Sequence, residues 1–361
     1  MKILLIGFAK IKYMPYLNFY LESIDRDKHD VHLLYWNRDL TEEDLSGYEN
    51  VNMHEFRCYQ EDNVSRRSKI VGFIKYCQYA KKVIKKNDFD FAIILHSFPG
   101  VLLHRIWIKR FKNKYIFDYR DSTYERYSFY KRIIAKLIAN SKGTFTSSDG
   151  FRVFFPKEEQ HRIYTSHNIL TDSLSHREYE KTACDKIRIA FWGFMREEET
   201  NKQVISSVAR DKRFELHFYG REQQIATNLR LFAEGLCADN VFFHGAYTAK
   251  DRYEFVKNTD IIHNVYRSHN AMLAMGNKYY DGAIFRIPQL CMRDSFMGKA
   301  ASEGGIGFEC DPFDEGFTDN VLSYFTELDR ESFNSNCDAE LDRLMEQYAS
   351  GTEFLKQIFE Q

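Results

Sequence analysis

The chain has 361 residues, of which 44% are hydrophobic and 16% aromatic, and its formal net charge at neutral pH is −1. This length suits two domains of ordinary size, and the apolar content is too high for an intrinsically disordered chain. No apolar run reaches the length that crosses a bilayer, so we expect a cytoplasmic protein rather than one with a membrane-spanning helix.

The first half of the chain alternates short apolar segments with amphipathic ones. The apolar segments are continuous hydrophobic runs, which are typical of strands buried on both faces of a parallel sheet. We expect strands at Lys2–Gly7, His29–Trp36, Phe89–Leu95, Lys114–Asp118 and Gly143–Thr146. Helices are expected between them, at Tyr16–Ser23, Ser65–Lys86, Val101–Phe111 and Tyr127–Asn140. This alternation predicts a parallel sheet with helices on both faces.

The second half repeats the same alternation. Strands are expected at Ile187–Trp192, Glu215–Tyr219, Val241–His244, Ile261–Asn264 and Gln289–Cys291, with helices between them. The tail Ala339–Phe359 has a helical pattern, and the polar, charged stretch Arg162–Ile187 is the expected linker between the halves.

Together these segments predict an α/β chain of two doubly wound, Rossmann-like domains. We place the first domain at residues 1–168 and the second at 169–344, with a last helix at 345–361 that packs back on the first domain. Domains of this kind bind ligands at the carboxyl ends of their strands, so two facing domains would enclose a cleft for a small molecule.

The cysteine and histidine patterns give no sign of a metal site. The seven cysteines are odd in number and include no CxxC pair, which favours reduced, buried thiols over a disulfide framework or a structural zinc site. The histidines show no metal-ligand spacing either. We therefore expect neither a bound metal nor a bound cofactor.

Charge is divided unevenly along the chain. Residues 1–170 hold 29 lysines and arginines against 20 aspartates and glutamates, whereas residues 171–361 hold 22 against 32. The segment Arg66–Lys142 alone has 19 basic and 5 acidic residues. A basic face of this kind attracts anionic lipid headgroups or phosphorylated substrates, although a solvated surface is the plainer alternative.

The helices expected in this basic segment mix lysine and arginine with aromatic and aliphatic residues. Such a face can lie on an anionic membrane, so peripheral contact at the inner face of the cell membrane is one option. A helix that packs its apolar side on a sheet gives a similar pattern. No base-reading module is present in the sequence, and nucleic acid is not an expected partner.

The stretch Ile187–Arg221 has the pattern of an anion-binding unit. An apolar strand ends at Gly193, and Arg196 and Lys202 flank the start of the helix that follows. Free N–H groups at a helix start and nearby positive side chains both favour phosphate. The second half of the chain therefore begins with a candidate phosphate site.

Four further segments complete a family pattern, and their order along the chain is the order found in that family. Asn277–Leu290 (NKYYDGAIFRIPQL) has a lysine, two aromatic positions, an acidic residue and a short helix that ends before a proline and a strand. Ser302–Phe308 has the turn that would follow, and Ser147–Gly150 and Ser166–Asn168 match the end of a first domain. With the phosphate segment, these motifs resemble the GT-B glycosyltransferases, in particular the family 4-like enzymes of bacterial surface and capsular polysaccharide synthesis.

The resemblance implies roles for several residues of the second domain. Asp281 would bind the nucleotide ribose, because a carboxylate accepts hydrogen bonds from both ribose hydroxyls; a plain surface charge is the alternative. Arg196 and Lys202, with Gly193, would hold the donor diphosphate and stabilise the charge that develops on it, without a metal. Lys278 is a further candidate contact. The co-substrate would be a UDP- or GDP-linked sugar.

The sequence also departs from the family pattern. A glycine-rich loop usually follows the first strand, but here Gly7 stands alone and is a candidate contact to the donor or acceptor. Lys10 or Lys12 either contacts the diphosphate or acceptor instead or is simply solvated. Many members carry an earlier glutamate, and that position falls near residues 273–274, where the chain has no acid. Asn270 nearby is a candidate contact to the donor or acceptor.

In the first domain, the segment Phe117–Arg126 (FDYRDSTYER) follows an expected strand and concentrates carboxylates. Asp121 is our candidate for a general base or an acceptor-orienting group. Arg120 pairs with it or binds an acceptor phosphate, unless the two form a structural pair at the next helix. His96 ends a strand on the same side and is a second catalytic candidate, with a structural role as the alternative.

These observations predict a retaining, metal-independent glycosyltransferase of the hexosyltransferase type. It would move a sugar from a nucleoside-diphosphate sugar to a hydroxyl of a glycan or polyprenyl-diphosphate-linked acceptor. Two alternatives keep the fold: a non-hydrolysing nucleotide-sugar epimerase, and a catalytically degenerate homologue that acts as a binding subunit. A nicotinamide-dependent dehydrogenase is disfavoured, because no GxGxxG follows either first strand.

Overall fold

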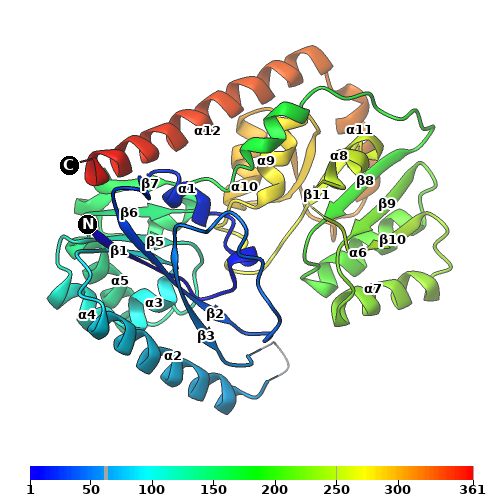
Figure 1. Cartoon of the computed structure of the whole chain (residues 1–361). Helices are drawn as coiled ribbons and strands as arrows, with labels where there is room; N and C mark the ends of the chain where they lie inside the picture. The colour runs from blue at the N-terminus through cyan, green and yellow to red at the C-terminus, as the bar shows by residue number, and fades with distance from the viewer. Residues whose placement is uncertain (61–63, 249, 361) are drawn as a thin grey trace. The chain divides into compact units, whose positions relative to one another are not determined.

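The computed structural model describes residues 1–60, 64–248 and 250–360, and the side chain of Arg66 lies outside this description. Figure 1 shows the chain as a series of helices and parallel strands. The chain divides into two compact units. Unit 1 comprises Met1–Asn168 with Glu346–Gln361, and unit 2 comprises Ile169–Met345.

Unit 1 is built on a seven-stranded, wholly parallel sheet. Its strand order is β3-β2-β1-β4-β5-β6-β7, so the order reverses between β1 and β4. Ile3 of β1 lies opposite Val31 on one side and Phe91 on the other. Ligands bind at such a reversal, outside the carboxyl ends of the strands. The strands are β1 (Lys2–Ile6), β2 (Asp30–Asn37), β3 (Asn52–Arg57), β4 (Phe91–Leu95), β5 (Tyr115–Tyr119), β6 (Gly143–Thr146) and β7 (Ile163–Thr165).

Helices cover both faces of this sheet, as the sequence predicts. The residues of α1 pack with those of the last turns of α12, where Leu355 and Phe359 join the cluster of β1 and β2. Burying each such side chain is worth about 1.5–3 kcal/mol. The helices of unit 1 are α1 (Leu17–Leu21), α2 (Arg66–Lys86), α3 (Ser97–Leu102), α4 (His104–Arg110) and α5 (Ser128–Asn140), together with the end of α12 (Arg330–Phe359).

Three predictions for unit 1 need correction. The helix expected at 101–111 is two helices, because the chain leaves the helical conformation at Leu103, with φ −111° and ψ 15°. The strand β3 was not predicted, since NMHEFR is a polar edge strand without a hydrophobic run. The expected linker at 162–187 begins with the short strand β7, which pairs with β6, so the segment between the units starts after it.

Unit 2 repeats the architecture with six parallel strands in the order β10-β9-β8-β11-β12-β13. The order reverses between β8 and β11, which makes the carboxyl end of β8 the expected place for a ligand. The strand β13 was not predicted from sequence. The strands are β8 (Ile187–Trp192), β9 (Phe214–Tyr219), β10 (Val241–Gly245), β11 (Ile261–Asn264), β12 (Gln289–Met292) and β13 (Gly307–Cys310).

Alternate residues of β8 pack on opposite layers of unit 2. Phe191 joins the cluster of α6 (Glu198–Ala209), α7 (Gln224–Gly235) and α11 (Phe317–Glu327). Trp192 joins the cluster on the other face. That layer contains α8 (Arg252–Phe255), α9 (Asn277–Ile284), α10 (Phe296–Glu303) and the first part of α12. Within the described ranges, no helix is long and apolar enough to cross a membrane.

Candidate functional site

Two glycines shape the loop between β8 and α6. Gly193 has φ +127°, a conformation that side chains rarely adopt, and its N–H donates to the Tyr219 carbonyl at 2.9 Å. At Gly220, which follows β9, a Cβ atom would stand 2.3 Å from the Gly193 carbonyl oxygen. Both positions therefore require glycine, and the two loops after β8 and β9 meet at their backbones.

Side chains then fix this loop in place. Glu197 has φ 58°, and its carboxylate accepts hydrogen bonds from the backbone N–H groups of Arg267 at 2.5 Å and Ser268 at 2.9 Å. Asn201 donates to the Arg196 carbonyl at 2.6 Å, and its own carbonyl oxygen lies 3.0 Å from Nε2 of His263. The loop is thereby tied to β11 and the segment after it, with Arg196 exposed at its end.

The two cations predicted to hold a diphosphate lie in different electrostatic surroundings. Lys202 contacts Glu198 at 2.7 Å and Glu199 at 3.2 Å, and its ammonium lies over the ring of Phe232 on α7. Its charge is therefore already balanced by carboxylates. Among the residues that the structure describes, no carboxylate forms an ion pair with Arg196, whose guanidinium lies over the ring of Phe194.

Lys278 lies at the start of α9 and is buried, with 8% of its surface exposed. Its ammonium donates to the Tyr266 hydroxyl and lies 4.3 Å from the ring centre of Phe191. Apart from the chain neighbours of Gly193, it is also the nearest described group to the position that a Cβ atom on Gly193 would take, at 4.0 Å. Burial lowers the pKa of Lys278 to about 7, further lowered by Arg196 and opposed by Asp281.

Asp281 is buried in the same layer, where both of its carboxylate oxygens accept hydrogen bonds. Nε1 of Trp192 donates to one at 2.8 Å, and Arg252 donates to the other at 3.1 Å. Arg252 also donates to the Ser173 hydroxyl at 3.2 Å. Burial raises the pKa of Asp281, while Arg252 and Trp192 oppose that rise. The predicted ribose contact would have to share this carboxylate with its present partners.

Arg252 is a charged residue of this site that sequence reasoning missed. It is 29 positions before Asp281 and lies on a helix of four residues, so no periodic pattern connects the two.

Asn270, which was a candidate contact, lies in the turn between β11 and α9. Its backbone carbonyl accepts hydrogen bonds from the N–H groups of Leu273 and Ala274.

In unit 1, the structure separates the three carboxylates of the segment after β5. Asp118 is fully buried, and one of its carboxylate oxygens lies 2.8 Å from Nε of Arg120. Glu125 is also buried and accepts from the Tyr119 hydroxyl at 2.6 Å and from the backbone N–H of Thr123. Asp121 is the half-exposed one, with 50% of its side-chain surface accessible. Of the three, it is the carboxylate that a ligand can reach.

His96 and Asp121, the two predicted catalytic residues, lie next to each other. Nε2 of His96 is 3.6 Å from a carboxylate oxygen of Asp121, because β4 and β5 are neighbours and both end here. Nδ1 of His96 accepts the N–H of Phe98 at 3.1 Å, so the neutral ring has its proton on Nε2, facing Asp121. His96 has φ 99° and ψ 150°, a conformation essentially reserved for glycine, and such strain is concentrated at functional sites.

Arg120 does not pair with Asp121, and this expectation was wrong. Its Nε donates to Asp118, and its two terminal nitrogens donate to the carbonyl and hydroxyl of Ser166 and to Asn168 at 2.6–3.2 Å. Its guanidinium also lies 4.0 Å from the ring centre of Tyr16. Buried among these partners, Arg120 joins the segment after β5 to the segment after β7.

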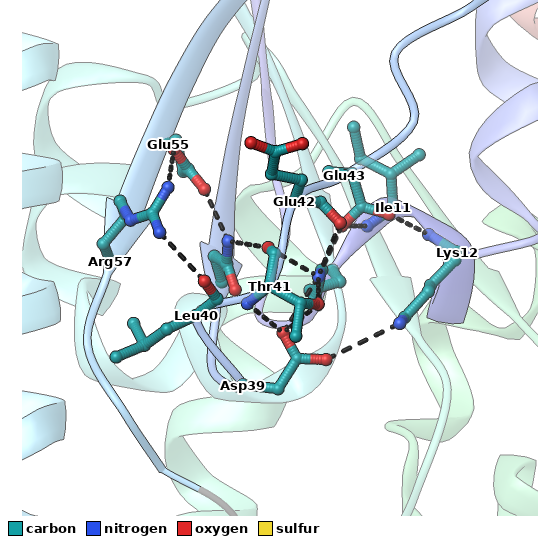
Figure 2. A network of polar contacts seen from close by, with 11 residues as sticks. Ile11, Lys12, Asp39, Leu40, Thr41, Glu42, Glu43, Glu55 and Arg57 are labelled. Atoms are coloured by element: carbon teal, nitrogen blue, oxygen red, sulfur yellow. Dashed lines mark hydrogen bonds and ion pairs between the residues drawn. The ribbon is translucent and has the colours of Figure 1, made fainter.

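Lys10 is held inside unit 1. Only 1% of its surface is exposed, and its ammonium donates to Asp39 at 2.9 Å, to the Thr41 hydroxyl at 2.7 Å and to two backbone carbonyls. Figure 2 shows the surrounding network, in which Asp39 also pairs with Lys12. Burial alone would raise the pKa of Asp39, but hydrogen bonds from Lys10 and Thr41 hold it below its ordinary value.

Gly7 is similarly enclosed. Its carbonyl accepts from the Tyr76 hydroxyl at 2.7 Å, and a Cβ atom at this position would stand 2.5 Å from the Met14 sulfur. Lys10 and Gly7 thus shape the loop after β1. In the part of the chain that the structure describes, no cluster of three or more histidine, cysteine or acidic side chains is arranged to hold a metal ion.

Neither a protein-family model nor a curated protein sequence matches this chain. Solved structures do match it. HepE from Anabaena, in complex with UDP and glucose, aligns with a TM-score of 0.69 and 12% identity over 98% of this chain and 99% of its own. Sucrose-phosphate synthase from Thermosynechococcus elongatus aligns with a TM-score of 0.71 and 10% identity over 99% of each chain. The chain therefore has the GT-B fold of two Rossmann-like domains, as the sequence predicts.

A candidate UDP-N-acetylglucosamine 2-epimerase from Listeria monocytogenes also matches, with a TM-score of 0.59 and 11% identity over 93% of this chain and 90% of its own. A sucrose-phosphate synthase and a candidate epimerase thus share this fold. The fold alone does not separate the two reactions, which have to be distinguished by the residues of the site.

Proposed function

We propose that this chain is a glycosyltransferase of the hexosyltransferase type, similar to family 4. It transfers a sugar from a UDP- or GDP-linked donor to a hydroxyl of a glycan or polyprenyl-diphosphate-linked acceptor, with retention of configuration, in bacterial polysaccharide synthesis. The observation that carries the proposal is the β8–α6 junction. There a glycine with φ +127° is followed by an exposed arginine without a carboxylate partner among the described residues, at the carboxyl end of the central strand of a GT-B domain.

In the proposed reaction, unit 2 binds the donor. Negative charge grows on the diphosphate as the bond to the sugar breaks, and fixed cations such as Arg196 stabilise that charge. Side chains that supply this charge allow the reaction to proceed without a metal ion. In the family pattern, Lys202 is assigned to the diphosphate and Asp281 to the ribose, but Lys202 is already paired with Glu198 and Glu199.

Asp121 and His96 of unit 1 are proposed to act on the acceptor. The exposed carboxylate of Asp121 can accept a hydrogen bond from an acceptor hydroxyl and take up its proton. The Nε2–H of His96 faces this carboxylate at 3.6 Å and can position it. His96 is itself held by the N–H of Phe98, so the pair is preorganised on two neighbouring strands.

The proposal includes peripheral contact with an anionic membrane at its cytoplasmic face, through α2. This helix has eight lysines and arginines and no acidic residue. Ile70, Val71 and Ile74 are 58%, 48% and 53% exposed on it. Apolar side chains that can enter the headgroup region, beside cations that attract anionic lipid, favour such binding. A membrane-embedded acceptor would then lie close to the enzyme.

A donor-turnover assay tests the proposal. The protein is incubated with UDP- and GDP-sugars, with and without a glycan acceptor, and both nucleotide release and the configuration of the donor sugar are followed. Acceptor-dependent release of one nucleotide, lost in Asp121→Asn, supports a transferase. A donor sugar that changes configuration without acceptor identifies an epimerase, and binding without any conversion identifies the degenerate homologue.

A further inference from the structure

Three cations of unit 2, Arg196 after β8, Lys202 on α6 and Lys278 on α9, differ in how their charges are balanced. Lys202 has two carboxylate partners, at 2.7 Å and 3.2 Å. Arg196 and Lys278 have none within ion-pairing distance, as far as the described part of the chain extends. The hydroxyl of Tyr266 accepts a hydrogen bond from Lys278 but cannot neutralise its charge.

The ammonium of Lys278 is directed at the space over Gly193. With the chain neighbours of Gly193 set aside, it is the one described group that comes within 4 Å of the position that a Cβ atom would occupy there. Because Gly193 has no side chain, no other described group outside its chain neighbours comes closer than this ammonium, at 4.0 Å. Lys202, in contrast, lies over Phe232 of α7.

The position of Lys278 is costly without an anion. Burial against the rings of Phe191 and Tyr266 removes water from the charged ammonium, which is unfavourable unless an opposite charge is near. The nearest carboxylate on its own helix, Asp281, is occupied by Trp192 and Arg252. The positive charge of Arg196 adds repulsion. A ligand with two negative groups would relieve both penalties at once.

We propose that Lys278, in place of Lys202, is the lysine that binds the diphosphate of the donor together with Arg196. This inference rests on the proposed function and deepens it, because it replaces the lysine assigned from the family pattern. The ligand class is a nucleoside diphosphate. Lys278 and Arg196 are close enough for Arg196 to lower the pKa of Lys278, and two such cations match two adjacent phosphates. The charge of Lys202, in contrast, is already balanced by carboxylates of its own helix.

The first test measures by calorimetry how UDP and GDP bind to the full chain and to two variants, each with one lysine replaced by methionine. We expect Lys278→Met to weaken binding of the diphosphate at least tenfold and to leave binding of the free nucleoside unchanged. The matched control, Lys202→Met, is expected to change the diphosphate affinity less than threefold. Thermal unfolding shows that each variant is folded; Lys278→Gln serves as a second variant if Lys278→Met is not.

The second test is the uptake of protons on binding, measured in two buffers of different ionisation enthalpy at pH 8. Since Lys278 is largely neutral there before binding, a diphosphate that contacts it should bring in close to one proton. We expect this uptake in the wild type and in Lys202→Met, and its absence in Lys278→Met. The titratable or charged groups around the ammonium are Asp281, Arg196, Tyr266, His263 and Cys291.

The outcomes separate this inference from the proposed function. If the wild type binds UDP or GDP but Lys202→Met loses that binding and Lys278→Met does not, the inference is wrong and the proposed function stands. If the wild type binds neither nucleotide at millimolar concentration, the proposed donor site is wrong and the inference falls with it. If Lys278→Met loses diphosphate binding and proton uptake while Lys202→Met keeps them, the result supports both the inference and the proposed function.

Discussion

At the scale of single residues, Lys278 and His96 are both held in energetically unfavourable states. Lys278 is an ammonium buried beside Phe191 and Tyr266. His96 has a backbone conformation that costs of order 1–3 kcal/mol in a residue other than glycine. Methionine at position 278 has no charge to desolvate, and glycine at position 96 has no Cβ atom that strains the backbone. Each therefore gives a stability measurement that reports on function.

The stability of the apo protein should depend on pH through Lys278. Its pKa is about 7 in the folded chain and 10.5 in the reference state, so the fold disfavours its charged form. The penalty is full below pH 7 and disappears as pH rises from 7 toward 10.5, at about 1.4 kcal/mol for each unit of pKa difference. We expect Lys278→Met to exceed the wild type in thermal stability by an amount that shrinks between pH 6 and pH 9.

The control for this experiment is Lys202→Met, whose stability difference from the wild type should lack this pH dependence. A constant difference between Lys278→Met and the wild type across the range would show that Lys278 is not desolvated as the structure indicates.

Replacement of His96 should reveal the backbone strain. Both His96→Gly and His96→Ala remove the imidazole and its contacts with Phe8 and Phe98, but only glycine adopts φ 99° without strain. We expect His96→Gly to be more stable than His96→Ala by about 1 kcal/mol, the reverse of the usual order, in urea denaturation. Turnover should fall in both. Equal stability of the two variants would contradict the strained conformation.

At the scale of elements, α2 has two different faces. Tyr76, Ala80 and Ile84 are buried on one face, while Ile70 and Ile74 are exposed on the other. At 100° per residue, Arg67, Lys81 and Lys85 share that exposed face. One face of the helix thus packs in the interior of unit 1, while the other face exposes apolar and basic side chains to solvent. The packing of unit 1 does not account for the exposed isoleucines.

This exposed face should bind anionic vesicles. We expect the double variant Ile70→Ser with Ile74→Ser to lower partition into phosphatidylglycerol-containing vesicles at least tenfold in a sedimentation assay. Two isoleucines that no longer enter the lipid account for more than the 1.4 kcal/mol that a tenfold change requires. Added salt should also weaken binding by the wild type.

The matched control is Leu231→Ser on α7 of unit 2, where the leucine is 60% exposed. Its vesicle binding should equal that of the wild type. If the double α2 variant binds as well as this control, α2 is not the membrane-binding element.

At the scale of the whole chain, each unit has its own hydrophobic core, and α12 contributes to both. Leu344 belongs to a cluster of unit 2, and Leu355 belongs to the cluster of α1, β1 and β2 in unit 1. Both leucines are fully buried. The two leucines are eleven positions apart on one helix, so this single helix contributes side chains to two separate cores.

These two leucines should affect different unfolding transitions. We expect Leu355→Ala to lower the stability of unit 1, and Leu344→Ala that of unit 2, by about 2–5 kcal/mol each, through the loss of buried methyl groups and the cavity left behind. Differential scanning calorimetry of the full chain measures both. Each variant serves as control for the other, and a single transition shifted alike by both would contradict independent cores.

The sequence alone determined the fold class and most of the strands of both sheets. Buried parallel strands such as β4 and β8 are continuous hydrophobic runs, and this signal is local, so it can be recognised without knowledge of the partners. The edge strands β3, β7 and β13 lack it, being polar or only three to four residues long. The order of motifs further indicated the GT-B fold, which the structure has.

Only the tertiary structure decided which charged residues remain available to a ligand. Asp118 and Asp121 are three positions apart, yet one is buried against Arg120 and the other faces His96. Lys278 lacks a carboxylate partner within the described residues, and Asp281 on the same helix is held by Arg252, far away in the sequence. The state of a charge depends on burial and on partners brought together by folding, and no local pattern in the sequence contains that information.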